Sequence, residues 1–321
     1  MQSELEKLCA GIDAATPLFV LIDPMVGEPI DGIGTLPSDA NPAALRSENW
    51  GREVLTVELP KSISLPLYQH PYLIQLTGKD DPLLELTFEI AVAEQTAACA
   101  GGLDGRGRAA HRIGGWLQSS MRWDALSELL ASMCELKTEA VTGASYLRVV
   151  DRRVLNLLRH VAGDHRVRAQ LGRIQNWSYL DSHGQLCRLE SPAEESVPLL
   201  LSVSEWQQME RGELLHRTLA MYAGDESLFA IRTTQPGYQA AMHAIAEAAN
   251  AASVWPHRFQ GIDDNLVWAT LVLRRPNIGQ EPAIRALLTQ TGTDLDPPEP
   301  VRFLYRDLIA LVATGFSSEP H

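Results

Sequence analysis

The stretch SYLRVVDRRVLNLLRHVAG, Ser145–Gly163, changes from apolar to acidic to basic within a few residues. SYLRVV has the short apolar pattern of a buried strand, and an aspartate follows it directly. Asp151 is a good helix N-cap, because its carboxylate can accept hydrogen bonds from the free N–H groups of the next turn. On a helix that begins at Arg152, one side carries the apolar residues Val154, Leu155, Leu158, Val161 and Ala162. The stretch therefore predicts a strand-to-helix junction capped by Asp151.

The segments on either side repeat this succession of strands and helices. Apolar runs that predict strands are PLFVLID (17–23), PYLIQLTG (71–78), HRIGGWLQS (111–119) and the hairpin pair IQNWSYL and QLCRLE around DSHG (174–190). Amphipathic segments after Pro82 and across DALSELLASMCELK (124–137) predict helices between them. Beyond the acidic linker ESPAEESVP, only helical patterns follow. We expect an α/β lobe with a mixed, partly parallel sheet over 1–190, and an all-helical lobe over 191–321.

Composition limits the classes of function. The 321 residues carry a formal net charge of −13, which argues against a general nucleic-acid binder and against a protein that adheres to an anionic membrane. The first residues lack the basic and apolar regions of a signal peptide, and no apolar run is long enough to span a membrane. The four cysteines are far apart with no CxxC pair, so we expect buried thiols in a reducing compartment. The expected location is the cytoplasm, and no membrane insertion is expected.

The arginines of the opening stretch have two interpretations. On the predicted helix, Arg152 and Arg159 lie opposite the apolar side, with Arg153 and His160 beside them. They would form an outward basic ridge that is either a solvated face or a docking surface for an acidic partner, since 148–190 holds eight arginines against four acidic residues. Arg148 differs, because it lies in a strand that should be covered. We expect it to pair with Asp151 or with a carboxylate of a neighbouring strand.

Motifs for small-molecule chemistry are weak. The glycine-rich segment Gly101–Gly107 lacks the GK[ST] of a phosphate loop. No GxSxG surrounds Ser119 or Ser120, and no HExxH exists. We therefore expect no catalytic residue, no metal site and no cofactor. The alternatives are an enzyme or binding module for a phosphorylated or nucleotide ligand, using Arg148, Arg153 and the Gly101–Gly107 loop, or a chain that self-associates through its helical lobe.

Three segments in order resemble a known family. GGWL-x-S (114–119), YLRVVDRRVL (146–155) and LGRIQNWSYLDSHG (171–184) are similar to the type VI secretion effector adaptor-chaperones, nicknamed Tap or TEC. The similarity spans Pro17 to Leu189. Two positions depart from it, because Arg152 and Arg173 stand where the family commonly has proline. The departures and the long insertions bear on which partner is served.

The resemblance implies a non-enzymatic role. Such adaptors bind the N-terminal region of a toxin effector and help load it onto the VgrG spike. The resemblance assigns Arg148, Asp151 and Arg153 to the family's junction, and Trp116 and Trp177 to its aromatic positions. The segment from Trp206 to Trp255 further predicts a groove for an amphipathic client helix, through Trp206, Met209, Met221, Met242 and Trp255. The expected partner-binding residues are Arg152, Arg153, Arg159, Trp206, Met209 and Trp255.

Overall fold

The computed structural model describes residues 3–30, 42–100, 110–138, 144–224, 236–290, 298–305 and 307–310. The chain divides into two compact units: 1–96 with 109–212, and 97–108 with 213–321. The predicted domain boundary between 190 and 191 stays a prediction. The described helices include none that is long and apolar enough to cross a membrane.

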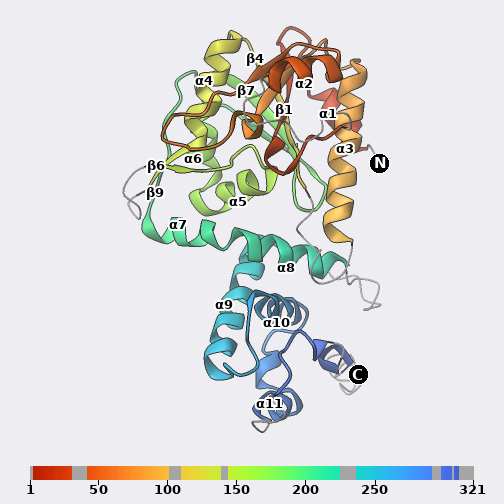
Figure 1. Ribbon diagram of the computed structural model, residues 1–321, viewed down its shortest axis with the longest axis vertical. Helices are drawn as coiled ribbons and strands as arrows, with labels where there is room; N and C mark the ends of the chain where they lie inside the picture. Colours follow the sequence, from red (N-terminus) through yellow and green to blue (C-terminus); the bar gives the residue numbers. More distant parts are fainter. Residues whose placement is uncertain are drawn as a thin grey trace. The chain divides into compact units, whose positions relative to one another are not determined.

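The first unit is built on a six-stranded sheet (Figure 1). Its strands are β1 (Leu18–Ile22), β2 (Val54–Thr56), β3 (Tyr72–Leu76), β4 (Ile113–Ser119), β7 (Ile174–Leu180) and β8 (Leu186–Glu190). They lie in the order β2-β3-β1-β4-β7-β8, and every neighbouring pair is antiparallel. The mixed α/β class is confirmed, and so is the 174–190 hairpin.

The expected partly parallel main sheet is wrong. β3 and β4, joined through helix α3 (Pro82–Cys99), are both antiparallel to β1. They therefore point the same way, as a helical crossover favours, but β1 lies between them and separates them. A second sheet has the order β6-β5-β9, formed by β5 (Glu135–Thr138), β6 (Ala144–Tyr146) and β9 (Leu200–Leu201). Among the described strands, only the short pair β5 and β9 is parallel.

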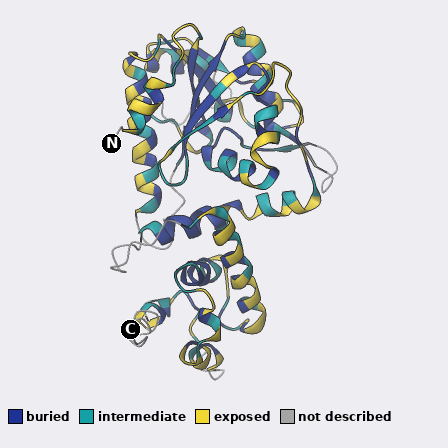
Figure 2. Cartoon of the chain, turned by 180° about the vertical axis from the view of Figure 1, so that it is seen from behind, coloured by how far each residue is buried: buried dark blue, intermediate teal, exposed yellow. Residues whose placement is uncertain are grey.

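Helices cover both faces of the main sheet, which explains why β1 is apolar at every position. Leu18, Val20 and Ile22 join one core cluster with α1 (Glu4–Ala10), α2 (Pro42–Trp50) and α3. Phe19 and Leu21 join the other with α4 (Trp123–Cys134) and α5 (Arg152–Ala162). Figure 2 shows the central strands as buried. Alternate side chains of a strand point to opposite faces, so a strand between two helical layers needs apolar residues throughout.

The remaining helices of the first unit are short. They are α6 (Asp164–Ala169), α7 (Val203–Glu210) and the 3-10 turns η1 (Pro24–Val26) and η2 (Leu67–Gln69). The four cysteines are free thiols; Cys134 is buried and the other three are half-buried.

The described residues of the second unit form helices and no strand. The elements are α8 (Gly212–Gly224), which begins at the last residue of the first unit, then α9 (Tyr238–Val254), α10 (Ile262–Arg274), η4 (Ile278–Gln280) and α11 (Pro282–Thr289). Small residues on one side of α9 are buried and let α10 pack closely: Ala241, Ala244, Ala248 and Ala251. Trp268, Trp255 and Phe259 form an aromatic cluster in this core.

Candidate functional site

The strand-to-helix junction holds a buried group of alternating charges. Asp23, directly after β1, accepts a hydrogen bond from Nε of Arg148 at 2.5 Å. Asp151 caps α5 by accepting the backbone N–H of Arg153, whose guanidinium also binds the carboxylate at 2.7 Å. Nη1 of Arg148 lies 3.6 Å from Asp151, so this arginine bridges both carboxylates. The predicted cap and the predicted partner of Arg148 are confirmed. The second partner, Asp23, is 125 residues away in the sequence.

The two carboxyl groups respond differently to burial. Burial raises the pKa of Asp23 to about 6, against the opposing charge of Arg148, and the negative charge of Asp151 adds to the rise. Burial also tends to raise the pKa of Asp151. There the charge and hydrogen bonds of Arg153, together with the charge of Arg148, outweigh it and hold the pKa well below its usual range. Asp151 is therefore a fixed anion, whereas Asp23 changes its charge in the range where cells operate.

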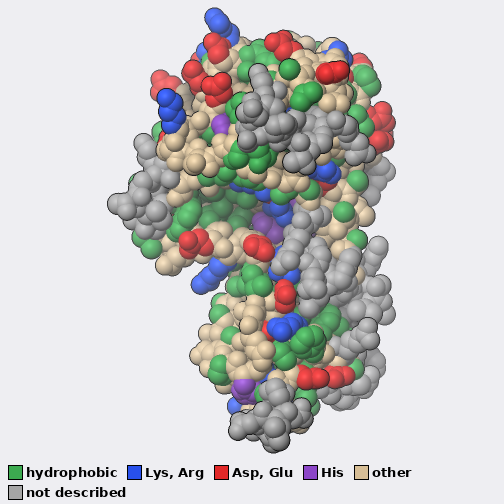
Figure 3. All heavy atoms as spheres, viewed as in Figure 1, with side chains coloured by type: hydrophobic (Ala, Val, Ile, Leu, Met, Phe, Trp, Pro, Cys, Tyr) green, Lys and Arg blue, Asp and Glu red, His purple; other side chains and the backbone are tan. Residues whose placement is uncertain are grey.

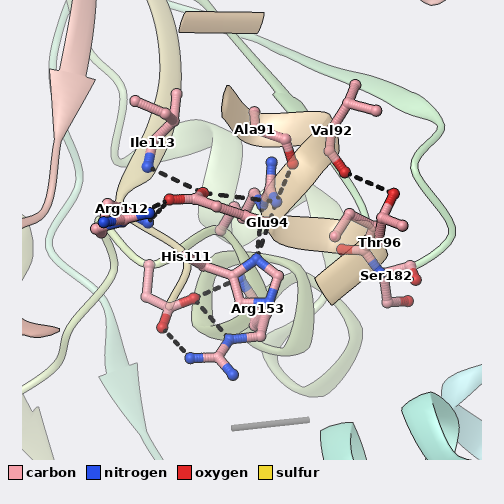
Figure 4. A network of polar contacts seen from close by, with 12 residues as sticks. Ala91, Val92, Glu94, Thr96, His111, Arg112, Ile113, Arg153 and Ser182 are labelled. Atoms are coloured by element: carbon pink, nitrogen blue, oxygen red, sulfur yellow. Dashed lines mark hydrogen bonds and ion pairs between the residues drawn. The ribbon is translucent and has the colours of Figure 1, made fainter. Parts of the chain in front are cut away.

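Arg152 turns inward toward the opposite side of the junction. Its Nη2 donates to the Ala91 carbonyl at 2.7 Å, and its Nε donates to Nδ1 of His111 at 3.1 Å. A guanidinium has no acceptor, so Nδ1 of His111 carries no proton. Glu94 lies 3.9 Å from Arg152 and accepts from the backbone N–H and Nε of Arg112 (Figure 4). Burial lowers the pKa of Arg152 to about 10.

The expected outward ridge is therefore wrong for Arg152, which is 2% exposed. The helical wheel of α5 has a second covered side, where Ala91 in the middle of α3 and His111 before β4 accept hydrogen bonds from this guanidinium. Arg159 is half-buried and contacts Asp164 and, at 2.6 Å, the hydroxyl of Tyr179. The structure brings Arg148 and Arg153 together on Asp151 and places Arg152 and Arg159 apart from that pair. Partner binding by Arg152, Arg153 and Arg159 stays a prediction.

The two tryptophans of the resembling motifs lie in the core of the first unit. Nε1 of Trp116 on β4 donates to the hydroxyl of Thr87 on α3. Nε1 of Trp177 on β7 donates to the carbonyl of Gly114. Gly115 has a positive φ of 133°, and a Cβ there would lie 2.7 Å from Nε1 of Trp177. The GGW sequence thus lets the Trp177 ring cross β4 closely, which is a structural role.

The predicted groove residues divide between the two units. Trp206 and Met209, on α7, are partly buried against the core of the first unit. Met221 and Trp255 are buried in the second unit, where Trp255 belongs to the aromatic cluster. Their contact with a client stays a prediction, and no shared groove is described for them.

An exposed apolar strip runs from residue 197 to residue 209 in the first unit. Val197, Leu200 and Val203 are 57%, 50% and 44% exposed. Three residues of chain span at most about 10 Å, so the Cα atoms of successive members of this series lie within that distance. Trp206 and Met209 continue the strip along α7, which has no buried residue. Figure 3 shows hydrophobic side chains in a hollow of the upper part of the molecule, next to Lys or Arg and His side chains.

The other residues that could take part in catalysis or ligand binding show no assembled site among the described residues. The buried Ser119 hydroxyl donates to the Arg173 carbonyl. A surface pocket of about 320 Å³ lies beside it, lined by Ser120, Gly172, Arg173, Gln175, Ser191, Pro192, Ala193 and Glu194. Within the described residues, no three histidine, cysteine or acidic side chains gather as metal ligands. The Gly101–Gly107 loop lies outside the described residues.

The sequence gives little sign of the acidic and imidazole members of the junction. Asp23 is recognisable only as the polar residue that ends an apolar strand. Glu94 and His111 belong to no sequence motif. Comparison with protein-family models, with curated proteins and with solved structures finds no significant match.

Proposed function

We propose that the chain is a non-enzymatic adaptor-chaperone, located in the cytoplasm, that binds a type VI secretion toxin effector and helps load it onto the VgrG spike. The observation that carries the proposal is the apolar strip 197–209. Adjacent exposed apolar side chains on an otherwise charged protein are typical of a surface that a protein partner covers.

The ion pairs at the strand-to-helix junction support this proposal over the phosphorylated-ligand alternative. Arg148 and Arg153 are bound to Asp23 and Asp151, and the Asp151 carboxylate already occupies the N-terminus of α5. A phosphate at this helix end would have to displace that carboxylate. The charged residues that the resemblance assigns to the junction thus have a role in the fold.

Co-expression with the toxin encoded beside this chain tests the proposal. We expect a stable complex of defined stoichiometry in size-exclusion chromatography, and a ternary complex when VgrG is added. A toxin and chain that never co-purify would contradict the adaptor function. Thermal stabilisation of the chain by ATP or inorganic phosphate, lost in Arg153→Lys, would favour the phosphorylated-ligand alternative instead.

A further inference from the structure

The charged residues around the strip 197–209 indicate which side chains a partner segment would carry. Glu194 and Glu195 are exposed three and two residues before Val197, and neither forms an ion pair with a described residue. At the other end, Glu210 accepts a hydrogen bond from Nε1 of Trp206 at 2.9 Å. This bond runs along α7 from a ring that is half-buried against the core of the first unit. The strip therefore has an acidic residue near each end.

The nearby arginines are already engaged. Arg166 binds Glu205 at 2.6 Å and also donates to the Leu200 carbonyl. Arg168 donates to the Glu190 carbonyl and lies 3.7 Å from Asp164. Two other exposed arginines, Arg173 and Arg211, have no ion pair with a described residue, and Arg173 lines the same surface pocket as Glu194. At this end of the strip, Glu194 and Glu195 therefore form an exposed acidic pair next to Arg173.

The edge of the small sheet is also closed to an added strand. β9 is two residues long, and the Arg166 guanidinium covers the Leu200 carbonyl. An extended partner would find few free backbone groups there. A helix that uses side chains alone fits better, because α7 presents Val203, Trp206 and Glu210 at helical spacing.

We propose that the strip 197–209 binds an amphipathic helix of the partner whose apolar face is flanked by lysine or arginine, with those cations set against Glu194 and Glu195. The inference rests on the proposed adaptor function and specifies the client segment that this function requires. The apolar contacts supply affinity, and the charges favour encounter and orientation.

The test uses the full-length chain and the N-terminal region of the co-expressed toxin. The double variant Glu194→Lys/Glu195→Lys should weaken binding by about 10-fold at low salt, and the difference should shrink as salt rises. Leu200→Asp should weaken binding by about 10-fold or more at every salt concentration. If Leu200→Asp perturbs the circular dichroism spectrum, Val197→Asp replaces it, since Val197 is more exposed.

The matched controls lie on α3, where Glu85, Glu89 and Val92 are exposed. Glu85→Lys/Glu89→Lys and Val92→Asp make the same chemical changes away from the strip, and they should leave affinity unchanged. Unchanged or tighter binding by Glu194→Lys/Glu195→Lys would overturn the basic-helix inference while the adaptor function stands. A concentration-dependent dimer that Leu200→Asp abolishes would also overturn it, because a second copy would then cover the strip. Absence of any complex with wild type would overturn both proposals.

Discussion

Replacing Asp151 should destabilise the first unit by more than the loss of a helix cap. The carboxylate accepts the Arg153 backbone N–H, pairs with the Arg153 guanidinium at 2.7 Å and lies 3.6 Å from that of Arg148. Loss of a cap costs about 0.5–2 kcal/mol. Removal of one partner of a buried ion pair costs roughly 3–5 kcal/mol. Asp151 is 1% exposed, so both losses apply. Asp151→Ala should lower the free energy of unfolding by about 4–6 kcal/mol.

Two further variants separate these contributions. Asn caps helices as well as Asp but carries no charge, so Asp151→Asn should lose only the ion-pair part, roughly 3–5 kcal/mol. Asp151→Asn combined with Arg153→Met removes both partners and should recover much of that loss. The control is Asp164→Ala. Its side chain is 46% exposed and pairs with Arg159 and Arg168, so its loss should stay below about 1 kcal/mol.

Urea unfolding followed by tryptophan fluorescence measures these free energies. Hydrogen exchange in peptides from 144–180 assigns the change to the first unit. If Asp151→Asn were as stable as wild type and Asp151→Ala lost less than about 2 kcal/mol, Asp151 would be only a cap. The charge network would then contribute nothing measurable.

The remaining predictions concern two other buried charges and the salt dependence of folding. The pKa of Asp23 rises from 3.8 to about 6 on folding, so the native state holds a proton that the unfolded state releases, and stability falls by roughly 3 kcal/mol as pH rises through this window. Asp23→Asn should match wild type near about pH 4 and exceed it by up to roughly 3 kcal/mol near about pH 7, and an equal difference at both pH values would refute the assignment. Arg152→Met removes a donor to the Ala91 carbonyl and to Nδ1 of His111 and should lower the free energy of unfolding by roughly 1–3 kcal/mol. Arg168→Met, with its side chain 38% exposed, should lower it by less than about 1 kcal/mol, and equal losses in urea unfolding would contradict the burial of Arg152. Because the Asp151–Arg153 pair is buried, about 1 M NaCl should change the loss caused by Asp151→Asn little, and a loss that disappears in salt would indicate an exposed pair.

Local patterns predicted several elements of the first unit, although the strand expected to run through Arg148 to Val150 ends at Tyr146. The apolar run before Asp23 is β1, the DSHG turn joins β7 and β8, and Asp151 caps α5. Each of these features is decided by residues close together in the sequence. Strand order is decided by contacts between distant segments, and the insertion of β1 between β3 and β4 leaves no mark in any short pattern.

The position of Arg152 shows the same limit for a side chain. The helical wheel assigned it to solvent because one side of α5 is clearly apolar. Its acceptors, His111 and the Ala91 carbonyl, come from segments 41 and 61 residues earlier. A long side chain at the first turn of a helix can reach such groups only where folding brings the side of another helix close to it. No residue adjacent to Arg152 in the sequence signals that neighbour.

These internal ion pairs also change what the charge of a sequence segment implies about the charge of its partner. Eight arginines against four acids in 148–190 favoured an acidic partner. Six of the eight form ion pairs, and three of their acidic partners come from outside that segment: Asp23, Glu94 and Glu205. An excess of positive charge in a stretch of sequence is therefore not an excess on the surface, because folding brings in acids from elsewhere. The exposed acids that remain beside the strip, Glu194 and Glu195, reverse the expectation and favour a basic client segment.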